Sequence, residues 1–421
     1  MKATIYPGIC QGEIKIPASK SMSHRAILAA SLAKGTSIIK DVAISQDIEA
    51  TIQGMRQLGA KIEWNEDQLV IHGIESLELN QDLEVDCNES GSTLRFFIPL
   101  FAATGGKIKF KGKNRLFKRP QTVYEEIFLQ QGHTFLQEND ELIVQGKLKA
   151  TDYTLKGDIS SQFISGLLFL LPLLDGDSTI TIKEPYESKS YVDLTILTLK
   201  KFGVRIFEEG NQYRIPGNQV YQPQELTVEK DFSQFAFFAV LSAINHPIRI
   251  LGMDPESLQG DKAIVKILKD FNAKVEIVND CYQISADQII ANSIDLSNCP
   301  DLGPILCVLG MFAEGKTIIH HAQRLRLKES DRIQAMETEL RKFNCDIHSD
   351  QDTIWIIGGQ KNVEEELDGW KDHRIVMALS IAATMMKKPI VIKGAEAINK
   401  SYPTFFEDLQ KLNIKVVLED D

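Results

Sequence analysis

The segment PASKSMSHRAILAA, residues 17–30, carries a polar run with a lysine and an arginine that leads directly into an apolar stretch. This order is typical of a helix start, where serine side chains accept hydrogen bonds from free backbone N–H groups. The positive end of the helix dipole adds to the charges of Lys20 and Arg25. Taken alone, the segment fits either an ordinary serine-capped helix or a binding site for an anion.

A strand-like motif recurs along the chain at intervals of about 70 residues, and self-similarity of this kind indicates a repeat protein. Each copy has a small or turn residue followed by a short run rich in β-branched residues. The six copies begin at Gly35, Gly106, Gly176, His246, Gly315 and Lys388. Together these units account for the whole chain.

Two further features recur in step with the strands. Downstream of each strand, an amphipathic helical pattern ends at a residue that tolerates the left-handed conformation, namely Gly59, Gly132, Gly203, Asn272, Asn344 and Asn413. Upstream of each strand, a polar run precedes an apolar helix, and these runs begin at Ser19, Ser90, Ser160, Asp231, Pro300 and Lys371. Helices without a polar face, such as those at residues 164–171 and 375–381, are expected to be buried.

The predicted repeat unit is therefore strand, buried helix, strand, outer helix and hairpin. Three glycines followed by three asparagines at the helix ends favour two lobes with three units each. We predict an α/β protein whose buried helices run in parallel within each lobe, with their N-termini facing a cleft between the lobes. Positive helix ends would then point into that cleft.

The chain ends suggest how the lobes are connected. The sixth unit lacks a hairpin partner after residues 414–418, whereas the chain begins with an orphan strand at residues 3–6. We therefore expect residues 1–19 to complete the C-terminal lobe, which continues at residues 229–421. The N-terminal lobe, residues 20–228, would be inserted between them, with hinges at the two crossings.

Composition limits the classes of partner. The 421 residues are 43% hydrophobic and 25% charged, and the formal net charge of -11 argues against nucleic acid or anionic membrane as a general partner. An anionic ligand would need basic residues concentrated in one cleft. The six cysteines form no C-x-x-C pair, the start lacks the apolar core of a signal peptide, and the apolar run at residues 163–174 is too short to span a bilayer. We predict a cytoplasmic monomer with reduced thiols.

Charged residues also recur in the loops between each strand and its outer helix. These loops lie at residues 114–120, 188–191, 324–332 and 399–402. A charge run alone is typical of a solvated surface. Because the charges recur at one point of the repeat, a shared cleft is the better interpretation.

Four segments resemble the signature segments of the 5-enolpyruvylshikimate-3-phosphate synthase family: PASKSMSHR (residues 17–25), SSQF (160–163), RLKESDR (326–332) and DHR (372–374). The resemblance covers the whole chain and implies two lobes of three βαβαββ units each. It also implies transfer of the enolpyruvyl group of phosphoenolpyruvate to the 5-hydroxyl of shikimate 3-phosphate. Phosphate is released, no metal or other cofactor takes part, and the pathway is that of the aromatic amino acids.

The resemblance also implies roles for individual residues. The shikimate 3-phosphate site would comprise Lys20, Ser21, Arg25, Ser160, Ser161, Gln162, Ser188, Tyr191, Asp301 and Lys328. The phosphoenolpyruvate site would comprise Lys20, Gly91, Arg119, Gln162, Arg332, His373, Arg374 and Lys400. Both substrates carry phosphate and carboxylate groups, which guanidinium groups bind through paired hydrogen bonds.

The same resemblance places Asp301, Glu329, Lys20 and Lys328 closest to the chemistry. The attacking hydroxyl must lose a proton and the enol methylene must gain one, so two proton-handling groups are needed. We expect Asp301 to hold and deprotonate the 5-hydroxyl. Glu329 would donate a proton to the methylene and later retrieve one, while the two lysines balance negative charge.

One position departs from the family pattern. Glu89 stands where family members commonly have asparagine, two residues before Gly91. An extra anion there would weaken phosphoenolpyruvate binding unless it turns away or pairs with a cation, so Glu89 is left out of the predicted site. The resemblance makes the chain a target of glyphosate, but the sequence does not predict how sensitive it is.

Two alternatives compete with this prediction. A related enolpyruvyl transferase acts on UDP-N-acetylglucosamine, but it is expected to have a reactive cysteine in a loop that here, at residues 115–120, has none. A non-catalytic phosphate-ligand binding protein on the same scaffold would have lost Asp301, Glu329 or Lys20, and all three are present.

Overall fold

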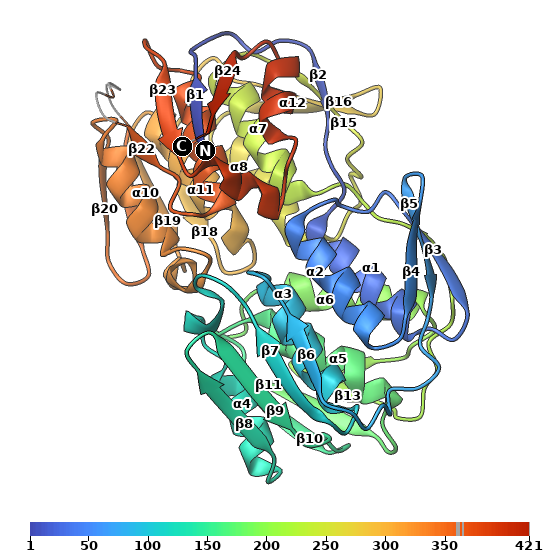
Figure 1. Cartoon of the computed structure of the whole chain (residues 1–421). Helices are drawn as coiled ribbons and strands as arrows, with labels where there is room; N and C mark the ends of the chain where they lie inside the picture. Colours follow the sequence, from blue (N-terminus) through green and yellow to red (C-terminus); the bar gives the residue numbers. More distant parts are fainter. Residues whose placement is uncertain (359–362, 364–365, 421) are drawn as a thin grey trace. The chain divides into compact units, whose positions relative to one another are not determined.

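A computed structural model describes residues 1–358, 363 and 366–420 of the chain. The fold divides into two compact units (Figure 1). The terminal unit consists of Met1–Pro17 and Lys230–Asp421, and the inserted unit consists of Ala18–Glu229. Each unit has its own apolar core of buried residues.

The second repeat of the inserted unit shows the common plan. Its elements are β6 (Leu83–Asp86), α3 (Gly91–Ala102), β7 (Lys107–Lys111), α4 (Thr122–Gln130), β8 (Thr134–Glu138) and β9 (Glu141–Gln145). The four strands form one sheet in the order β6-β7-β9-β8. The pair β6–β7 is parallel and the other pairs are antiparallel, as the predicted strand, helix, strand, helix and hairpin require.

The other two repeats of the inserted unit follow the same plan. The first comprises α1 (Lys20–Leu32), β3 (Thr36–Lys40), α2 (Gln46–Gln57), β4 (Lys61–Asn65) and β5 (Gln68–His72). The third comprises β10 (Asp152–Lys156), α5 (Ser161–Leu170), β11 (Ser178–Lys183), α6 (Lys189–Lys201), β12 (Phe207–Glu209) and β13 (Gln212–Ile215). The missing first strand of the first repeat is β14 (Glu225–Thr227), which returns to pair in parallel with β3.

The terminal unit also holds three repeats. The fourth comprises β2 (Glu13–Lys15), α7 (Phe232–Ile244), β15 (Arg249–Leu251), α8 (Ala263–Asp270), β16 (Lys274–Val278) and β17 (Cys281–Ser285). The fifth comprises β18 (Ser293–Asp295), α9 (Gly303–Phe312), β19 (Lys316–His320), α10 (Arg332–Arg341), β20 (Asp346–Ser349) and β21 (Ile354–Ile357). The sixth comprises β22 (Leu367–Asp368), α11 (His373–Ala383), β23 (Ile390–Lys393), α12 (Phe405–Lys411), β24 (Val416–Glu419) and β1 (Lys2–Ile5).

The N-terminal segment completes two repeats of the terminal unit. Strand β1 pairs antiparallel with both β23 and β24, so the orphan first strand fills the sixth repeat as predicted. Strand β2 pairs in parallel with β15 and supplies the first strand of the fourth repeat. The sequence prediction did not contain this second strand or β14, because segments of three residues carry too little pattern to be recognised.

The six predicted helix ends are confirmed. Gly59, Gly132, Gly203, Asn272, Asn344 and Asn413 all have positive φ, from 57° at Asn344 to 104° at Gly59. Glycine adopts this conformation without a steric cost and asparagine at a small one, so each residue lets the chain leave its helix and enter the next strand.

Helices α1, α3, α5, α7, α9 and α11 are buried almost throughout, and the sheets of each unit lie around them (Figure 1). In most strands buried and exposed residues alternate, which turns one face of each sheet toward the helices.

No helix of the described residues is long and apolar enough to cross a membrane. All six cysteines are buried, and none of them forms a disulfide.

Short 3₁₀ helices occupy several of the connections. They are η1 (Leu116–Lys118), η2 (Leu171–Leu173), η3 (Gly260–Lys262), η4 (Pro300–Leu302), η5 (Gln323–Leu327) and η6 (Ala395–Lys400). η1, η5 and η6 lie in the charged loops that precede the outer helices. Lys400 is the last residue of η6, and the predicted site residues Arg119, Lys328, Glu329 and Arg332 follow η1 and η5.

Candidate active site

The starts of the buried helices differ in one respect. Ser19, Ser90, Ser160, Asp231 and Asp372 each accept a hydrogen bond from a backbone N–H of the helix that follows. The fifth start is different: in the described chain no side-chain hydrogen bond caps η4 or α9. Asp301 lies in η4, and its carboxylate contacts three cations. This departure singles out Asp301 as a residue whose charge is used elsewhere.

Asp301 belongs to a group of charged residues in the terminal unit that we call the acid–base cluster: Asp301, Lys328, Glu329, Arg332, Asp372 and Arg374. Asp301 Oδ1 lies 3.2 Å from Lys328 Nζ and 3.1 Å from Arg332 Nη1, and Oδ2 lies 3.2 Å from Arg374 Nη2. Burial alone would raise the pKa of Asp301, but the three cations hold it well below its usual value. Asp301 is therefore ionised at neutral pH.

Arg332, the first residue of α10, is the centre of the cluster. Its side chain is 1% exposed, and its Nη2 donates to Glu329 Oε2 at 2.7 Å. Its Nε donates to Asp372 Oδ2 at 2.8 Å. Burial alone would lower the pKa of Arg332, but the carboxylates of Asp372, Glu329 and Asp301 raise it. One guanidinium thus holds three carboxylates in a fixed arrangement.

Asp372 joins the cluster to α11. Its Oδ1 accepts from the backbone N–H of Arg374 at 2.9 Å and caps the helix, while Oδ2 accepts from Ser330 Oγ at 3.0 Å as well as from Arg332. Burial alone would raise the pKa of Asp372, but Arg332 outweighs it and the pKa falls to about 2. Asp372 is therefore a structural anion rather than a proton carrier at neutral pH.

The remaining predicted residues of the terminal unit lie near this cluster. Burial lowers the pKa of Lys328, against the opposing effect of Asp301. His373 is buried, with Nδ1 3.8 Å from Asp372 Oδ1. Lys400, at the end of η6, donates from Nζ to the backbone oxygen of Lys371 at 2.7 Å. The structure thus brings Asp301, Lys328, Glu329, Arg332, His373 and Arg374 together, and ties Lys400 to the residue that precedes Asp372.

Arg25 of the inserted unit is a buried cation whose hydrogen-bond acceptors are neutral. Arg25 is 2% exposed and donates from Nε to Thr195 Oγ1 at 2.8 Å, from Nη1 to the backbone oxygen of Ser21 at 2.7 Å, and from Nη2 to that of Tyr191 at 2.9 Å. Burial lowers the pKa of Arg25 to about 10. A buried cation with neutral partners is a favourable place for an anionic ligand.

The third repeat contributes Ser188 and Tyr191 beside Arg25. Ser188 is buried and precedes α6 with a left-handed backbone, φ 54°, and its backbone oxygen accepts from the backbone N–H of Tyr191 at 3.1 Å. A non-glycine residue in this conformation is uncommon and marks a locally constrained turn. The constraint places Tyr191 O against Arg25.

Lys20, the first residue of α1, forms an ion pair with Asp47 of α2, with Nζ 2.9 Å from Oδ2. The sequence prediction did not include Asp47. Its only sequence signal is its place in the first turn of a serine-capped helix, where acidic residues are common.

Gln162 of the predicted site is held by Arg95, which the prediction did not include. Arg95 Nη1 donates to Gln162 Oε1 at 2.7 Å, and Gln162 Nε2 donates to Ser92 Oγ at 2.9 Å. The guanidinium of Arg95 also lies 4.8 Å from the ring centre of Phe163. Ser160 caps the same helix and Ser161 is its buried first residue. Arg95 follows its capping Ser90 by five residues, close to the six that separate Arg25 from Ser19, and this similarity was the available signal.

Gly91 and Arg119 lie in direct contact at the start of α3. A Cβ atom added to Gly91 would lie 2.5 Å from Arg119 Nη1, so a larger residue here would force this guanidinium to move. Two residues earlier, Glu89 Oε1 accepts from Asn114 Nδ2 at 2.6 Å. Glu89 thus contacts the loop that carries Arg119.

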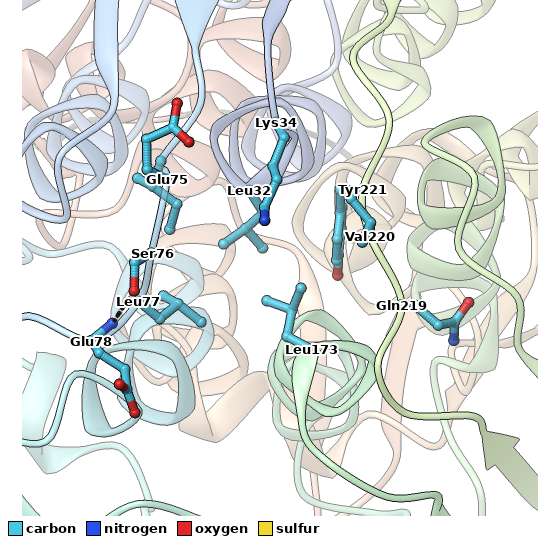
Figure 2. Close-up of a pocket in the computed structure, with 11 residues that line it drawn as sticks. Leu32, Lys34, Glu75, Ser76, Leu77, Glu78, Leu173, Gln219, Val220 and Tyr221 are labelled. Atoms are coloured by element: carbon cyan, nitrogen blue, oxygen red, sulfur yellow. Dashed lines mark hydrogen bonds between the residues drawn. The ribbon is translucent and has the colours of Figure 1, made fainter.

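The inserted unit also contains a pocket of about 280 Å³ that holds none of the predicted site residues. Leu32 at the end of α1 and Leu173 of η2 line it, so it lies at the C-terminal ends of the buried helices. Figure 2 shows Leu32, Leu77 and Leu173 pointing toward a common space. The predicted site residues of this unit lie at or near the helix N-termini and their adjoining loops, and this pocket is separate from them.

Comparisons with known proteins agree with the geometry. The family model for EPSP synthase (3-phosphoshikimate 1-carboxyvinyltransferase) matches residues 7–409. The 3-phosphoshikimate 1-carboxyvinyltransferase of Clostridium kluyveri is 45% identical over 415 residues, which cover 97% of this chain and 96% of that protein. The corresponding protein of Clostridioides difficile is 44% identical over 428 residues, which cover 98% and 97%.

Solved structures have the same fold. An EPSP synthase from Acinetobacter baumannii superimposes with a TM-score of 0.79 at 26% identity and covers 99% of this chain and 100% of that chain. The enolpyruvyl transferase NikO from Streptomyces tendae shares the fold at 15% identity, with a TM-score of 0.79 and coverage of 99% and 98%. The matches of the family model and of the clostridial relatives span nearly the whole sequence, and the chain therefore belongs to the EPSP synthase (3-phosphoshikimate 1-carboxyvinyltransferase) family of enzymes.

Proposed function

We propose that this chain transfers the enolpyruvyl group of phosphoenolpyruvate to the 5-hydroxyl of shikimate 3-phosphate and releases phosphate. The observation that carries the proposal is the arrangement of Asp301 and Glu329 on the single guanidinium of Arg332. Two carboxylates with different surroundings can perform opposite proton transfers, which this reaction needs.

Asp301 is the group that receives the hydroxyl proton. Its low pKa keeps it ionised in the substrate-free enzyme, so its carboxylate accepts a hydrogen bond from the 5-hydroxyl. As the oxygen attacks C2 of phosphoenolpyruvate, a C–O bond forms and the hydroxyl proton passes to Asp301. Lys328, 3.2 Å from Asp301 Oδ1, stabilises the negative charge that develops on the attacking oxygen.

Glu329 delivers the proton that the methylene carbon gains in the same step. Bound phosphoenolpyruvate is strongly anionic, and a nearby anion favours the protonated form of a carboxyl group. In the second step the C–O bond to phosphate breaks, and Glu329 takes back a proton from the new methyl group. The proton that Asp301 accepted leaves with the phosphate, so both carboxylates return to their starting states and the products are the enol ether and inorganic phosphate.

The two units contribute different parts of substrate binding. In the inserted unit, Ser21, Arg25, Ser160, Ser161, Gln162, Ser188 and Tyr191 would bind shikimate 3-phosphate, while Lys20, Gly91 and Arg119 would bind phosphoenolpyruvate. In the terminal unit, His373, Arg374 and Lys400 would bind phosphoenolpyruvate around Arg332. Guanidinium groups buried at 2% (Arg25), 7% (Arg119) and 4% (Arg374) exposure bind anions strongly because water does not screen them.

Phosphate release is the direct test. The purified chain is incubated with phosphoenolpyruvate and either shikimate 3-phosphate or UDP-N-acetylglucosamine, with and without a metal chelator. We expect release with shikimate 3-phosphate only, unchanged by the chelator. Release with the nucleotide sugar would assign the chain to the alternative reaction, and release with neither would make it a binding protein. We also expect a monomer in analytical ultracentrifugation and a cytoplasmic location in cell fractionation.

A further inference from the structure

The turn at residues 368–371, which leads into α11, has an unusual backbone. Trp370 and Lys371 are consecutive and both have φ 52°, in the left-handed region. For residues with a side chain this conformation is sterically unfavourable, and it persists only where the surroundings hold it. The turn immediately precedes Asp372, His373 and Arg374.

Glu339 on α10 is hydrogen-bonded to this turn at two places. Its side chain is 1% exposed, and its Oε1 accepts from Trp370 Nε1 at 2.9 Å. Its Oε2 accepts from the backbone N–H of Asp368 at 3.0 Å and from Lys342 Nζ at 2.9 Å. A buried carboxylate that accepts from three donors has its hydrogen-bonding capacity satisfied. Removing one donor leaves a buried oxygen unpaired, which is energetically unfavourable.

This turn also positions Lys400 and the start of α11 in the candidate active site. The backbone oxygen of Lys371 accepts from Lys400 Nζ at 2.7 Å. The backbone N–H of Asp372 donates to Gly369 O at 2.9 Å, which sets the start of α11 and therefore Arg374. Helix α10 thus holds the segment at two places, through Arg332 on Asp372 and through Glu339 on Trp370 and Asp368.

We propose that Glu339 and Trp370 are positioning residues for the phosphoenolpyruvate-binding cations of the terminal unit. Their hydrogen bond keeps Trp370 and Lys371 in the left-handed conformation that presents the Lys371 carbonyl to Lys400 and orients Arg374. Neither residue is in the segments that resemble the family signatures or in the charged loops. The inference rests on the proposed function, because phosphoenolpyruvate is the ligand that the positioned cations bind.

Trp370→Phe is the first test, because it keeps an aromatic ring and removes only the indole N–H. Trp355→Phe is the matched control, since Trp355 is a half-buried tryptophan of the same unit that stacks on His348. We expect Trp370→Phe to raise KM for phosphoenolpyruvate roughly two- to thirtyfold, as expected for residues that act through others. KM for shikimate 3-phosphate should stay within about twofold of wild type, as should both constants in the control.

A backbone test uses Lys371, whose side chain is exposed. Lys371→Gly favours the left-handed conformation and should leave KM for phosphoenolpyruvate unchanged, whereas Lys371→Val disfavours it and should raise that KM. This pair separates the shape of the turn from the lysine charge, because both variants lose the same ammonium group. It also keeps the inference testable if Trp370→Phe folds poorly.

The outcomes separate this inference from the proposed function. If wild type is active and Trp370→Phe and Lys371→Val leave KM for phosphoenolpyruvate unchanged, or raise both KM values equally, the positioning role is refuted. If wild type releases no phosphate, the proposed function fails. Calorimetric titration with phosphoenolpyruvate in the presence of shikimate 3-phosphate then decides the inference, because equal affinity in wild type and Trp370→Phe would overturn it.

Discussion

Arg25 of the inserted unit and Arg332 of the terminal unit are both almost completely buried, at 2% and 1% exposure, yet their surroundings are opposite. The partners of Arg25 are a hydroxyl and two backbone carbonyls, and its pKa falls to about 10. Arg332 faces Asp301, Glu329 and Asp372, and its pKa is raised. The difference indicates that Arg25 is suited to bind an anion from outside the protein, whereas Arg332 organises the protein's own carboxylates.

The largest expected effects are on the two catalytic carboxylates. Asp301→Asn and Glu329→Gln should lower kcat by roughly 10²- to 10⁴-fold, with much smaller changes in KM, because proton transfer is lost while shape is kept. Steady-state kinetics measure both constants. Asp295→Asn, at an exposed carboxylate of the same unit, is the control and should leave kcat near wild type. A change mainly in KM would contradict the assigned roles.

The next prediction compares the stability effects of the two arginines directly. Arg332→Met leaves three carboxylates without their shared cation and should lower the free energy of unfolding by about 3–5 kcal/mol. Arg25→Met removes a buried cation whose partners are neutral, so the loss should be smaller, about 1–3 kcal/mol. Urea denaturation of the full chain measures both. Equal losses would remove the contrast between the two sites.

Arg25→Ala should weaken shikimate 3-phosphate binding, measured by calorimetry, by roughly tenfold to a hundredfold, the value of one or two charge-assisted hydrogen bonds. Arg56→Ala removes an exposed arginine of the same unit and serves as the control. Unchanged affinity in Arg25→Ala would exclude Arg25 from the site.

Gly91→Ala tests the anion-binding side of the inserted unit without removing a charge. The added methyl would lie 2.5 Å from Arg119 Nη1 and should displace that guanidinium, raising KM for phosphoenolpyruvate by about tenfold. In Gly8→Ala the methyl meets Ile414 Cδ1 at an ordinary 3.6 Å, so KM should not change. A wild-type KM in Gly91→Ala would show that Arg119 is not needed in this position.

The smallest expected effect is a difference in acid sensitivity. The pKa of Asp372 is about 2 in the folded protein and 3.8 as its ordinary value, so its ionised form stabilises the fold. This contribution is fully present above the ordinary pKa and is lost as pH falls through the folded pKa. The difference in unfolding free energy between wild type and Asp372→Asn should therefore shrink as pH falls from about 5 to about 2. The difference in unfolding free energy between wild type and Arg25→Met should stay constant over this range. If the unfolding free energies of wild type and Asp372→Asn also changed in parallel with pH, the proposed difference between the two sites would be wrong.

Much of the fold follows from local patterns. The six helix ends at Gly59 to Asn413 were predictable because left-handed residues are restricted by sterics that act within one residue. The pairing of β1 with β23 and β24 was predictable because one repeat lacked a strand and the chain began with one. Strands β2 and β14 were missed, since three residues gain their strand identity from the neighbour they pair with.

The candidate site shows the same division. The positions of Arg25, Arg332 and Arg374 were predictable from charged segments placed at fixed points of the repeat. Asp47 and Thr195 were not, because each acts as the partner of a site residue from a distant part of the chain. Glu339 and Trp370, 31 residues apart in the sequence, likewise meet only after folding.

The sequence by itself determined the repeat, the positions of the helix starts and the residue types at the site, because hydrophobic period, caps and turn residues act locally. Only the tertiary structure decided which arginine has its charge neutralised by carboxylates of the protein. Arg25 and Arg332 are the same chemical group, and the pKa of each depends on burial and on nearby charges, which for Arg332 come from Asp301 and Glu329 of its own repeat and from Asp372 of the next. The side chain is encoded locally, but its electrostatic role depends on three-dimensional neighbours.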